Sequence, residues 1–360
     1  MPITITNSSN VKSNTEDVKV TESSNNLKQV SEVWECDANK TLRLKWQNKL
    51  NVFMFSGMAG TPYYSKEGLQ WTSIANTPFS NQIQGMVYFK KYFYVAVIRD
   101  GIYRTKNFTS WEKVWETTTE YPRNLTITNG KLFVCGSVLL VSDDGVNFTN
   151  VRSSLNTYSI DIITIQYWSV SNRYTVITTE TGSGDNSQYI VTNSTFEKIS
   201  SNYLGAVNIE IFDSRFHPFD GIYALVVMNK TYTDIRLDVI EFDSNGVKTK
   251  STTLTTFELI SGIGGVQSTD GTSNAFIPAA SQGMYKVYRV ASTGQFNVVR
   301  MVPVGKSIHA TGCRQKDGYV VAFDVQYSGT GKTLTGSAAG LTESAYTFPY
   351  RNIMMLAYSN

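Results

Sequence analysis

The chain has 360 residues, of which 41% are hydrophobic and 17% are charged, and its formal net charge is +3. A charge this weak argues against nucleic acid as a partner, and the sequence has no run of about 18 apolar residues that would predict a membrane-spanning helix. The first twenty residues lack the apolar core of a signal peptide, so we expect neither secretion by such a signal nor insertion into a membrane.

Short, strongly apolar segments, each preceded by a tight turn, recur seven times along the chain. These expected strands cover residues 50–55, 92–98, 131–135, 174–178, 222–228, 275–279 and 319–323. The turns before them centre on Asn48-Lys49, Lys90-Lys91, Asn129-Gly130, Asn172-Arg173, Asp220-Gly221, Asp270-Gly271 and Asp317-Gly318. Asparagine and aspartate tolerate positive φ, as glycine does, so these turns favour hairpins.

The spacing of the turns indicates the fold. Successive turns lie 39 to 50 residues apart, and blades of roughly 40–50 residues with four strands are typical of β-propellers. No helical periodicity competes with this pattern. The sequence therefore predicts an all-β fold, a seven-bladed β-propeller, in which the apolar segments are the second strand of each blade.

A second repeated feature combines a hydroxyl residue, an acid or amide, usually a glycine, and then an aromatic residue. Its clear copies contain Ser65, Glu67, Gly68 and Trp71, then Thr105, Asn107 and Trp111, then Ser142, Asp144, Gly145 and Phe148. The hydroxyl and the acid can hydrogen-bond the backbone of a turn, glycine supplies positive φ, and the aromatic ring can pack back between sheets. Weaker copies fall at 192–196, 244–246 and 292–296.

These turns resemble the Asp-box of sialidase-like and BNR-repeat propellers, although the usual Asp-box has one more residue between the acid and the glycine. The resemblance implies a structural role at the hairpin between the third and fourth strands of a blade. It says little about function, because the Asp-box in that family faces away from the central site.

The two ends of the chain suggest how the ring closes. Residues 353–360 contain a tyrosine-serine pair that aligns with Tyr64-Ser65, which places them as the third strand of the last blade. That blade then lacks a fourth strand, and residues 27–30 lie at the spacing expected before a first strand at 41–46. We predict that this N-terminal strand closes the last blade and so removes open sheet edges.

The remaining N-terminal residues are rich in serine, asparagine and threonine. We predict a flexible arm at 1–24 and the propeller at 25–360. Residues 3–6 and 18–21 alternate like short strands, which would let the arm add to the sheet of a neighbouring protein.

Patterns that point to chemistry are weak. The segment 329–333 lacks the first glycine of a P-loop and the helix that should follow it. Cys313 and His309 lie four residues apart on an expected strand, but no close ligand pair supports a zinc site. With Cys36 and Cys135, the cysteines indicate buried thiols in a reducing compartment rather than a disulfide framework. We expect no catalytic residue, no cofactor and no metal.

A sialidase-like glycosidase is the enzymatic alternative that the resemblance implies. The Arg-Ile-Pro signature of that family is absent, and Arg43 has no matching arginines on the other expected inner strands. Paired carboxylates from separate blades stay open as an alternative. Tyr121, Tyr203 and Tyr350 lie in expected loops, where they could form a face that binds sugar or protein.

The composition resembles that of virion proteins, those of bacteriophages in particular. We therefore expect a non-enzymatic virion component that docks on other capsid or tail proteins through the arm and one propeller face, or binds a host surface glycan or protein. The alternatives are a carbohydrate-active propeller, either lectin or glycosidase, and a cytosolic scaffold that binds peptides. A fold of this kind does not decide among them.

Overall fold

The computed structural model describes residues 3–5, 18–21, 27–29, 32–36, 42–47, 53–57, 61–65, 67–155, 160–180, 187–204, 210–230, 234–258, 267–279, 282–315, 317–325, 331–348 and 353–358. The chain forms two compact units, Met1–Leu50 and Asn51–Asn360. Among the residues just given, none belongs to a helix with the length and apolar character of a membrane span.

The first unit contains two small sheets. In one, β1 (Ile3–Ile5) pairs in parallel with β2 (Val18–Thr21), which pairs antiparallel with β3 (Leu27–Gln29). In the other, β4 (Glu32–Cys36) pairs with β5 (Leu42–Gln47). Both alternating segments near the N-terminus are therefore strands. The segment expected as the first strand of a propeller blade, β5, lies instead in a two-stranded sheet.

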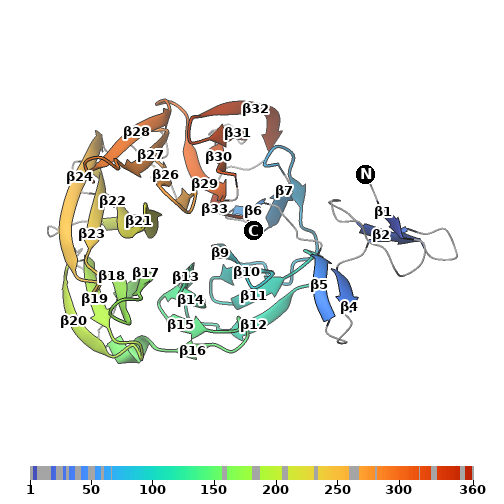
Figure 1. The fold of residues 1–360 in the computed structure, drawn as a ribbon, viewed down its shortest axis with the longest axis horizontal. Helices are drawn as coiled ribbons and strands as arrows, with labels where there is room; N and C mark the ends of the chain where they lie inside the picture. Colours follow the sequence, from blue (N-terminus) through green and yellow to red (C-terminus); the bar gives the residue numbers. More distant parts are fainter. Residues whose placement is uncertain are drawn as a thin grey trace. The chain divides into compact units, whose positions relative to one another are not determined.

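The second unit is an all-β propeller. Its described residues form seven four-stranded antiparallel sheets around a common axis, which confirms the seven-bladed fold (Figure 1). We number the blades 1 to 7 along the chain and name the strands of each blade A to D from the axis outward. Each predicted apolar segment contributes strand B, as expected.

The strands of blades 1 to 4 have the following bounds. Blade 1 contains β33 (Ile353–Tyr358), β6 (Phe53–Gly57), β7 (Pro62–Ser65) and β8 (Thr72–Ser73). Blade 2 contains β9 (Ile83–Phe89), β10 (Tyr92–Val97), β11 (Gly101–Thr105) and β12 (Glu112–Glu116). Blade 3 contains β13 (Pro122–Thr128), β14 (Lys131–Gly136), β15 (Leu139–Ser142) and β16 (Thr149–Asn150). A short 3-10 helix, η1 (Arg152–Leu155), leads to blade 4, with β17 (Ile160–Trp168), β18 (Arg173–Glu180), β19 (Ser187–Thr192) and β20 (Lys198–Tyr203).

Blades 5 to 7, like blades 2 to 4, are each built from four consecutive strands. Blade 5 contains β21 (Glu210–Phe219), β22 (Ile222–Lys230), β23 (Asp234–Phe242) and β24 (Lys248–Glu258). Blade 6 contains β25 (Ser268–Thr269), β26 (Asn274–Pro278), β27 (Met284–Arg289) and β28 (Phe296–Val302). Blade 7 contains β29 (Ile308–Arg314), β30 (Tyr319–Val325), β31 (Gly331–Ser337) and β32 (Gly340–Phe348).

The ring closes differently from the prediction. Blade 7 already has its own fourth strand, β32, and the C-terminal strand β33 pairs with β6 as the innermost strand of blade 1. The placement of 353–360 as a third strand was therefore wrong. The fourth strand of blade 7 is β32, and the closure predicted for residues 27–30 stays a prediction. The sequence of β33, IMMLAY, suits a strand that has neighbouring blades on both faces, because such strands read as continuous apolar runs. The two ends of the propeller still share one sheet.

The described A–B turns follow the chemistry that the sequence predicts, and the turn predicted at Asn48-Lys49 lies outside the described residues. Asn129 and Gly130 have φ of 53° and 67°, the backbone of a tight hairpin that matches the twist of its strands. Lys90 and Lys91 adopt the same conformation, with φ of 46° and 70°, although side chains disfavour it. The two hairpins therefore share one backbone geometry, even though lysine is less suited than asparagine or glycine to positive φ.

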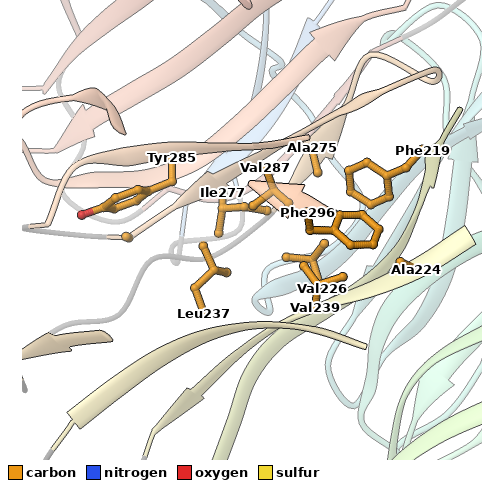
Figure 2. Packing of buried hydrophobic residues seen from close by; sticks show 11 residues of the cluster. Phe219, Ala224, Val226, Leu237, Val239, Ala275, Ile277, Tyr285, Val287 and Phe296 are labelled. Atoms are coloured by element: carbon orange, nitrogen blue, oxygen red, sulfur yellow. The ribbon is translucent and has the colours of Figure 1, made fainter. Parts of the chain in front are cut away.

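The core lies between the blades, where neighbouring sheets pack face to face. Between blades 5 and 6, Val226 and Val239 on one sheet meet Ala275, Ile277 and Val287 on the other (Figure 2). Burial of both faces explains why the B strands are continuously apolar: in β10 every residue from Phe93 to Val97 is fully buried. Because hydrophobic burial contributes about 25 cal/mol per Å², these contacts are the main force that holds the blades together.

Antiparallel order gives the propeller two unlike ends. The A–B turns of blades 2 to 7 and the C–D turns of all blades lie at one end, which we call the hairpin face. The B–C loops and D-to-A connections lie at the other end, which we call the loop face. Each innermost strand begins at the loop face, because it follows a D-to-A connection. This order separates the repeated turns predicted from sequence from the mouth of the axis described below.

Candidate functional site

The clearest repeated turn, between β15 and β16 of blade 3, has the predicted hydrogen bonds. Ser142 Oγ accepts from Gly145 N at 2.8 Å and donates to Asp144 Oδ1 at 3.0 Å. Asp144 Oδ1 also accepts from the backbone N of Val146 and Asn147, both at 2.8 Å. These donors, with the amide of Asn147 first among them, hold the pKa of the Asp144 carboxyl well below its usual range.

The corresponding turn of blade 2 has the same bonds with one difference. Thr105 Oγ1 accepts from Phe108 N at 2.9 Å, and Asn107 Oδ1 accepts from the backbone N of Thr109 and Ser110 at 3.1 and 3.0 Å. Phe108 takes the position of the glycine, with φ of 62°. A side chain is tolerated there because the Phe108 ring is buried, and it stacks on Tyr64 of blade 1 with ring centroids 5.1 Å apart.

These turns connect each blade to the one before it. A Cβ atom added to Gly145 would lie 2.7 Å from Cζ of Tyr94 in blade 2, and one added to Gly68 would lie 2.5 Å from Cγ2 of Val321 in blade 7. Trp71, which follows the blade 1 turn, packs on Phe323 of blade 7 with ring centroids 5.1 Å apart. The turns are therefore packing devices between blades.

The other predicted turn residues fit the same description. Ser65 is buried, and the backbone oxygen of Glu67 accepts from Tyr319 Oη of blade 7 at 2.9 Å. Trp111 packs edge-on against Phe79 at 5.2 Å, and Phe148 packs against the apolar cluster shared by blades 2 and 3. All of these residues lie at the hairpin face or between blades, as a structural motif requires.

The loop face has a repeated irregularity that the sequence did not predict. Six A strands have a β-bulge towards their first residue: β9, β13, β17, β21, β29 and β33. In each of them, one extra residue without a partner lies between the two residues that pair with consecutive residues of strand B. The bulged residues are Gln84, Arg123, Ile163, Phe212, His309 and Met354. Side chains of a strand alternate between the two faces of the sheet, and a bulge redirects one of them. Bulges are common next to functional sites. We call this ring of positions the axial mouth.

The bulges expose one residue among buried ones. Gln84, Ile163 and His309 are half-buried, whereas Ile83, Ile162 and Ile308 before them are almost wholly buried. The Arg123 side chain is 51% exposed and bonds Asp161 of blade 4 at 2.9 Å. An isoleucine precedes the bulged residue in five of the six described cases, and this repeated isoleucine is the only mark of the bulges in the sequence. Sequence reasoning did not predict the bulges, because a single extra residue leaves the apolar pattern of a short strand almost unchanged.

At the rim of the axial mouth in blade 2, Arg99 forms the tip of the B–C loop. Its backbone has φ of 51°, and its N donates to Glu120 O at 3.1 Å. Its guanidinium Nη2 donates to Tyr121 Oη, and Cζ lies 4.8 Å from the centroid of the Tyr121 ring. Arg99 is exposed and Tyr121 is half-buried, so the cation faces solvent beside a partly exposed ring.

Blade 3 fixes the partners of Arg99. Ser137 Oγ accepts from Tyr121 N at 2.7 Å and donates to Glu120 Oε2 at 2.6 Å, and Ser137 N donates to Tyr121 O at 3.1 Å. Gly136 approaches so closely that an added Cβ would overlap Tyr121 O. The rim is therefore held by hydrogen bonds that join the backbone of Tyr121, the backbone and hydroxyl of Ser137 and the carboxylate of Glu120.

On blade 7, charged residues of the loop face satisfy one another. Lys306 pairs with Asp324 at 3.2 Å and with Glu343, which also pairs with Lys332. The hydrogen bond from Lys306 lowers the pKa of Glu343, and the same bond raises the pKa of Lys306.

His309 Nε2 lies 2.9 Å from Ser307 Oγ, the distance of a nucleophile and its base. Asp324, however, accepts from Ser307 N at 2.8 Å and pairs with Lys306, so it orients the strand rather than the imidazole. Burial lowers the pKa of His309.

Polar side chains also link neighbouring inner strands, both at the mouth and further along them. Asn124 Nδ2 donates to Ile163 O of blade 4 at 2.9 Å, and Ser268 Oγ bonds Thr311 Oγ1 of blade 7 at 3.0 Å. His217 Nε2 bonds Gln267 Oε1 of blade 6 at 2.9 Å, and burial lowers the pKa of His217 to about 4. This imidazole is therefore neutral at pH 7 and has a structural role.

Two of the three cysteines and residues 331–333 of the glycine-rich segment are described; residues 329 and 330 and the side chain of Cys36 lie outside the described residues. Cys135 and Cys313 are buried free thiols, and burial raises the pKa of each to about 12. No group of three His, Cys, Asp or Glu side chains suited to a metal occurs in the described part of the chain. Gly331, Lys332 and Thr333 lie in β31, where Thr333 Oγ1 accepts from Trp71 Nε1 at 3.3 Å.

The loop aromatics named from the sequence lie apart. Tyr121 belongs to the rim described above, and Tyr203 is 58% exposed at the end of β20 in blade 4. Tyr350 and the side chain of Arg43 lie outside the described residues. The sequence indicated Tyr121 as one of three loop aromatics, and it gave no prediction of Arg99 or of the ring of bulges.

Comparison with known proteins shows the fold. No family model matches the chain, and no curated protein matches it. A solved protein from Lactobacillus plantarum is 11% identical with a TM-score of 0.58, covering 86% of this chain and 99% of that one. A candidate 6-phosphogluconolactonase from Bacteroides uniformis is 10% identical with a TM-score of 0.57, covering 85% and 98%. A functionally unknown protein from Desulfotomaculum acetoxidans is 10% identical with a TM-score of 0.54, covering 86% and 100%.

At these identities the likeness concerns the propeller alone, because one fold hosts many functions. The chain is thus a seven-bladed propeller similar in architecture to these structures. Its resemblance to sialidase-like propellers, which rests on the C–D turns, stays a hypothesis.

Proposed function

We propose that this chain is a non-enzymatic propeller that binds a partner at the axial mouth, and that it serves as a virion component docking on other particle proteins. The repeated β-bulge is the observation that carries the binding role. It presents Gln84, Arg123, Ile163 and His309, side chains of unlike chemistry, at one mouth. A rigid scaffold with varied residues at equivalent positions suits recognition.

The surrounding charges support binding more than catalysis. Asp161 pairs with Arg123, and Asp324 pairs with Lys306 while accepting from a backbone amide. A general acid or base needs a pKa near the working pH and must be free to reach the substrate. These carboxylates are instead engaged in bonds that hold the axial mouth together. The virion role rests on composition: few charges and many small polar residues.

A carbohydrate-active propeller, lectin or glycosidase, is the second candidate. It rests on the Asp-box resemblance of the C–D turns of blades 2 and 3, where Asn107 and Asp144 cap backbone amides, and not on any residue of the axial mouth. A cytosolic peptide-binding scaffold would use the same axial mouth and differs in the partner alone.

Photo-crosslinking from two positions tests the proposal. Gln84 at the axial mouth and the exposed Thr109 at the hairpin face are each replaced by a photoreactive phenylalanine, and particles are purified from the cells that make the protein. We expect an adduct with one particle protein from the Gln84 position and none from Thr109. Equal adducts from both positions, or the absence of the chain from particles, would refute the docking role. Turnover of fluorogenic glycosides, or of a lactone, would refute the non-enzymatic role.

A further inference from the structure

Arg99 is a charged side chain held in place at an energetic cost. Its φ of 51° lies in the left-handed region, which residues other than glycine, asparagine and aspartate rarely adopt. The backbone bond to Glu120 O and the contacts with Tyr121 keep it there. Strained residues of this kind concentrate at binding and catalytic sites, where the surrounding structure over-determines them.

The donors of this arginine are largely unused. In the described part of the rim, Arg99 has no carboxylate partner, and its guanidinium bonds the phenol oxygen of Tyr121. The neighbouring acids have other partners: Asp100 accepts from Lys113 Nζ at 2.8 Å, and Glu120 accepts from Ser137 Oγ at 2.6 Å. A guanidinium has five N–H donors in a planar fork, so Arg99 presents several to solvent.

We propose that Arg99 and Tyr121 form a carboxylate-binding subsite at the rim of the axial mouth, which takes an acidic side chain of a partner protein. The inference rests on the proposed function and names the chemistry of its partner. The planar fork of arginine matches a carboxylate in two parallel bonds. Because Tyr121 and the loop backbone already order the side chain, less conformational entropy is lost on binding.

The surroundings favour a peptide over an acidic sugar. The guanidinium of Arg99 covers one face of the Tyr121 ring, so the ring holds the cation and is no open platform for a sugar. Arginine and tyrosine, with tryptophan, are the residues most enriched at the energetic centres of protein interfaces.

Fluorescence anisotropy with three labelled probes tests the subsite: hexaglutamate, hexaglutamine and tetragalacturonate. We expect hexaglutamate to bind the full-length protein and hexaglutamine to bind much more weakly. Arg99→Gln should weaken hexaglutamate binding about tenfold or more, and Arg99→Lys, which keeps the charge but loses the fork, about threefold. Tyr121→Phe keeps the ring and should weaken binding about threefold, because it removes the bond that orients the guanidinium.

Lys106→Gln is the matched control. Lys106 Nζ lies 4.6 Å from the Tyr92 ring centroid on the hairpin face, so this variant removes the same charge from a similar cation–tyrosine pair at the other end of the propeller. It should leave binding unchanged, and thermal unfolding of all variants should match the unaltered protein.

The subsite is overturned if Lys106→Gln and Arg99→Gln weaken hexaglutamate binding equally, or if Arg99→Gln leaves hexaglutamate binding unchanged. Tighter binding of tetragalacturonate than of hexaglutamate overturns the peptide assignment. A Gln84 crosslink to a particle protein that persists in Arg99→Gln, with hexaglutamate binding also unchanged, leaves the axial mouth as the docking site and removes this subsite alone.

Discussion

Replacing Gly145 by alanine measures how much the repeated turns contribute to the contact between blades. Gly145 has φ of 78°, and an L side chain in this region costs about 1 kcal/mol. The new Cβ would also lie 2.7 Å from Cζ of Tyr94 and closer still to its Oη. Tyr94 is fully buried among aromatic neighbours, so it has little room to move. Overpacking of this kind costs about 1–3 kcal/mol.

We therefore expect Gly145→Ala to lower the free energy of unfolding by about 2–4 kcal/mol, measured by urea denaturation. Gly130→Ala is the control, because Gly130 has φ of 67° and no atom within 4 Å of the added Cβ. It should cost about 1 kcal/mol, the backbone effect alone.

The double variant Gly145→Ala with Tyr94→Phe should recover part of the loss, since it removes the hydroxyl but not the ring carbon. Equal destabilisation by Gly145→Ala and Gly130→Ala would show that contact with the preceding blade contributes nothing, and would refute the reasoning.

Three further predictions concern pH, thiols and ring closure. Because the pKa of Asp144 is lowered in the folded chain, its carboxylate stabilises the fold above the unfolded pKa of about 3.9, and the stability advantage over Asp144→Asn should shrink as pH falls below that value. In a Cys36→Ser background, Cys135 and Cys313 should not react with a disulfide reagent at pH 8 until urea unfolds the chain; rapid native labelling would contradict their burial. Deleting residues 352–360 removes β33 from blade 1 and should abolish cooperative unfolding and increase proteolysis, whereas an unchanged transition would show that β33 does not close the ring.

The sequence by itself determined the local structure of each blade. The B strands, the hairpin turns and the hydrogen bonds of Ser142 and Asp144 were predictable because they depend on residues a few positions apart. Apolar runs buried on both faces and turn residues with positive φ leave clear marks at short range.

Tertiary structure decided how the ring closes and where the candidate site lies. A tyrosine-serine match suggested a third strand at 353–360, but pairing of β33 with β6, about 300 residues earlier in the chain, made it an innermost strand. The bulges at Gln84 and His309, and the contact of Arg99 with Tyr121, also depend on which strands lie side by side. A strand's sequence specifies that it will be buried, but only its neighbours decide its register, its bulges and the direction of the side chains they expose.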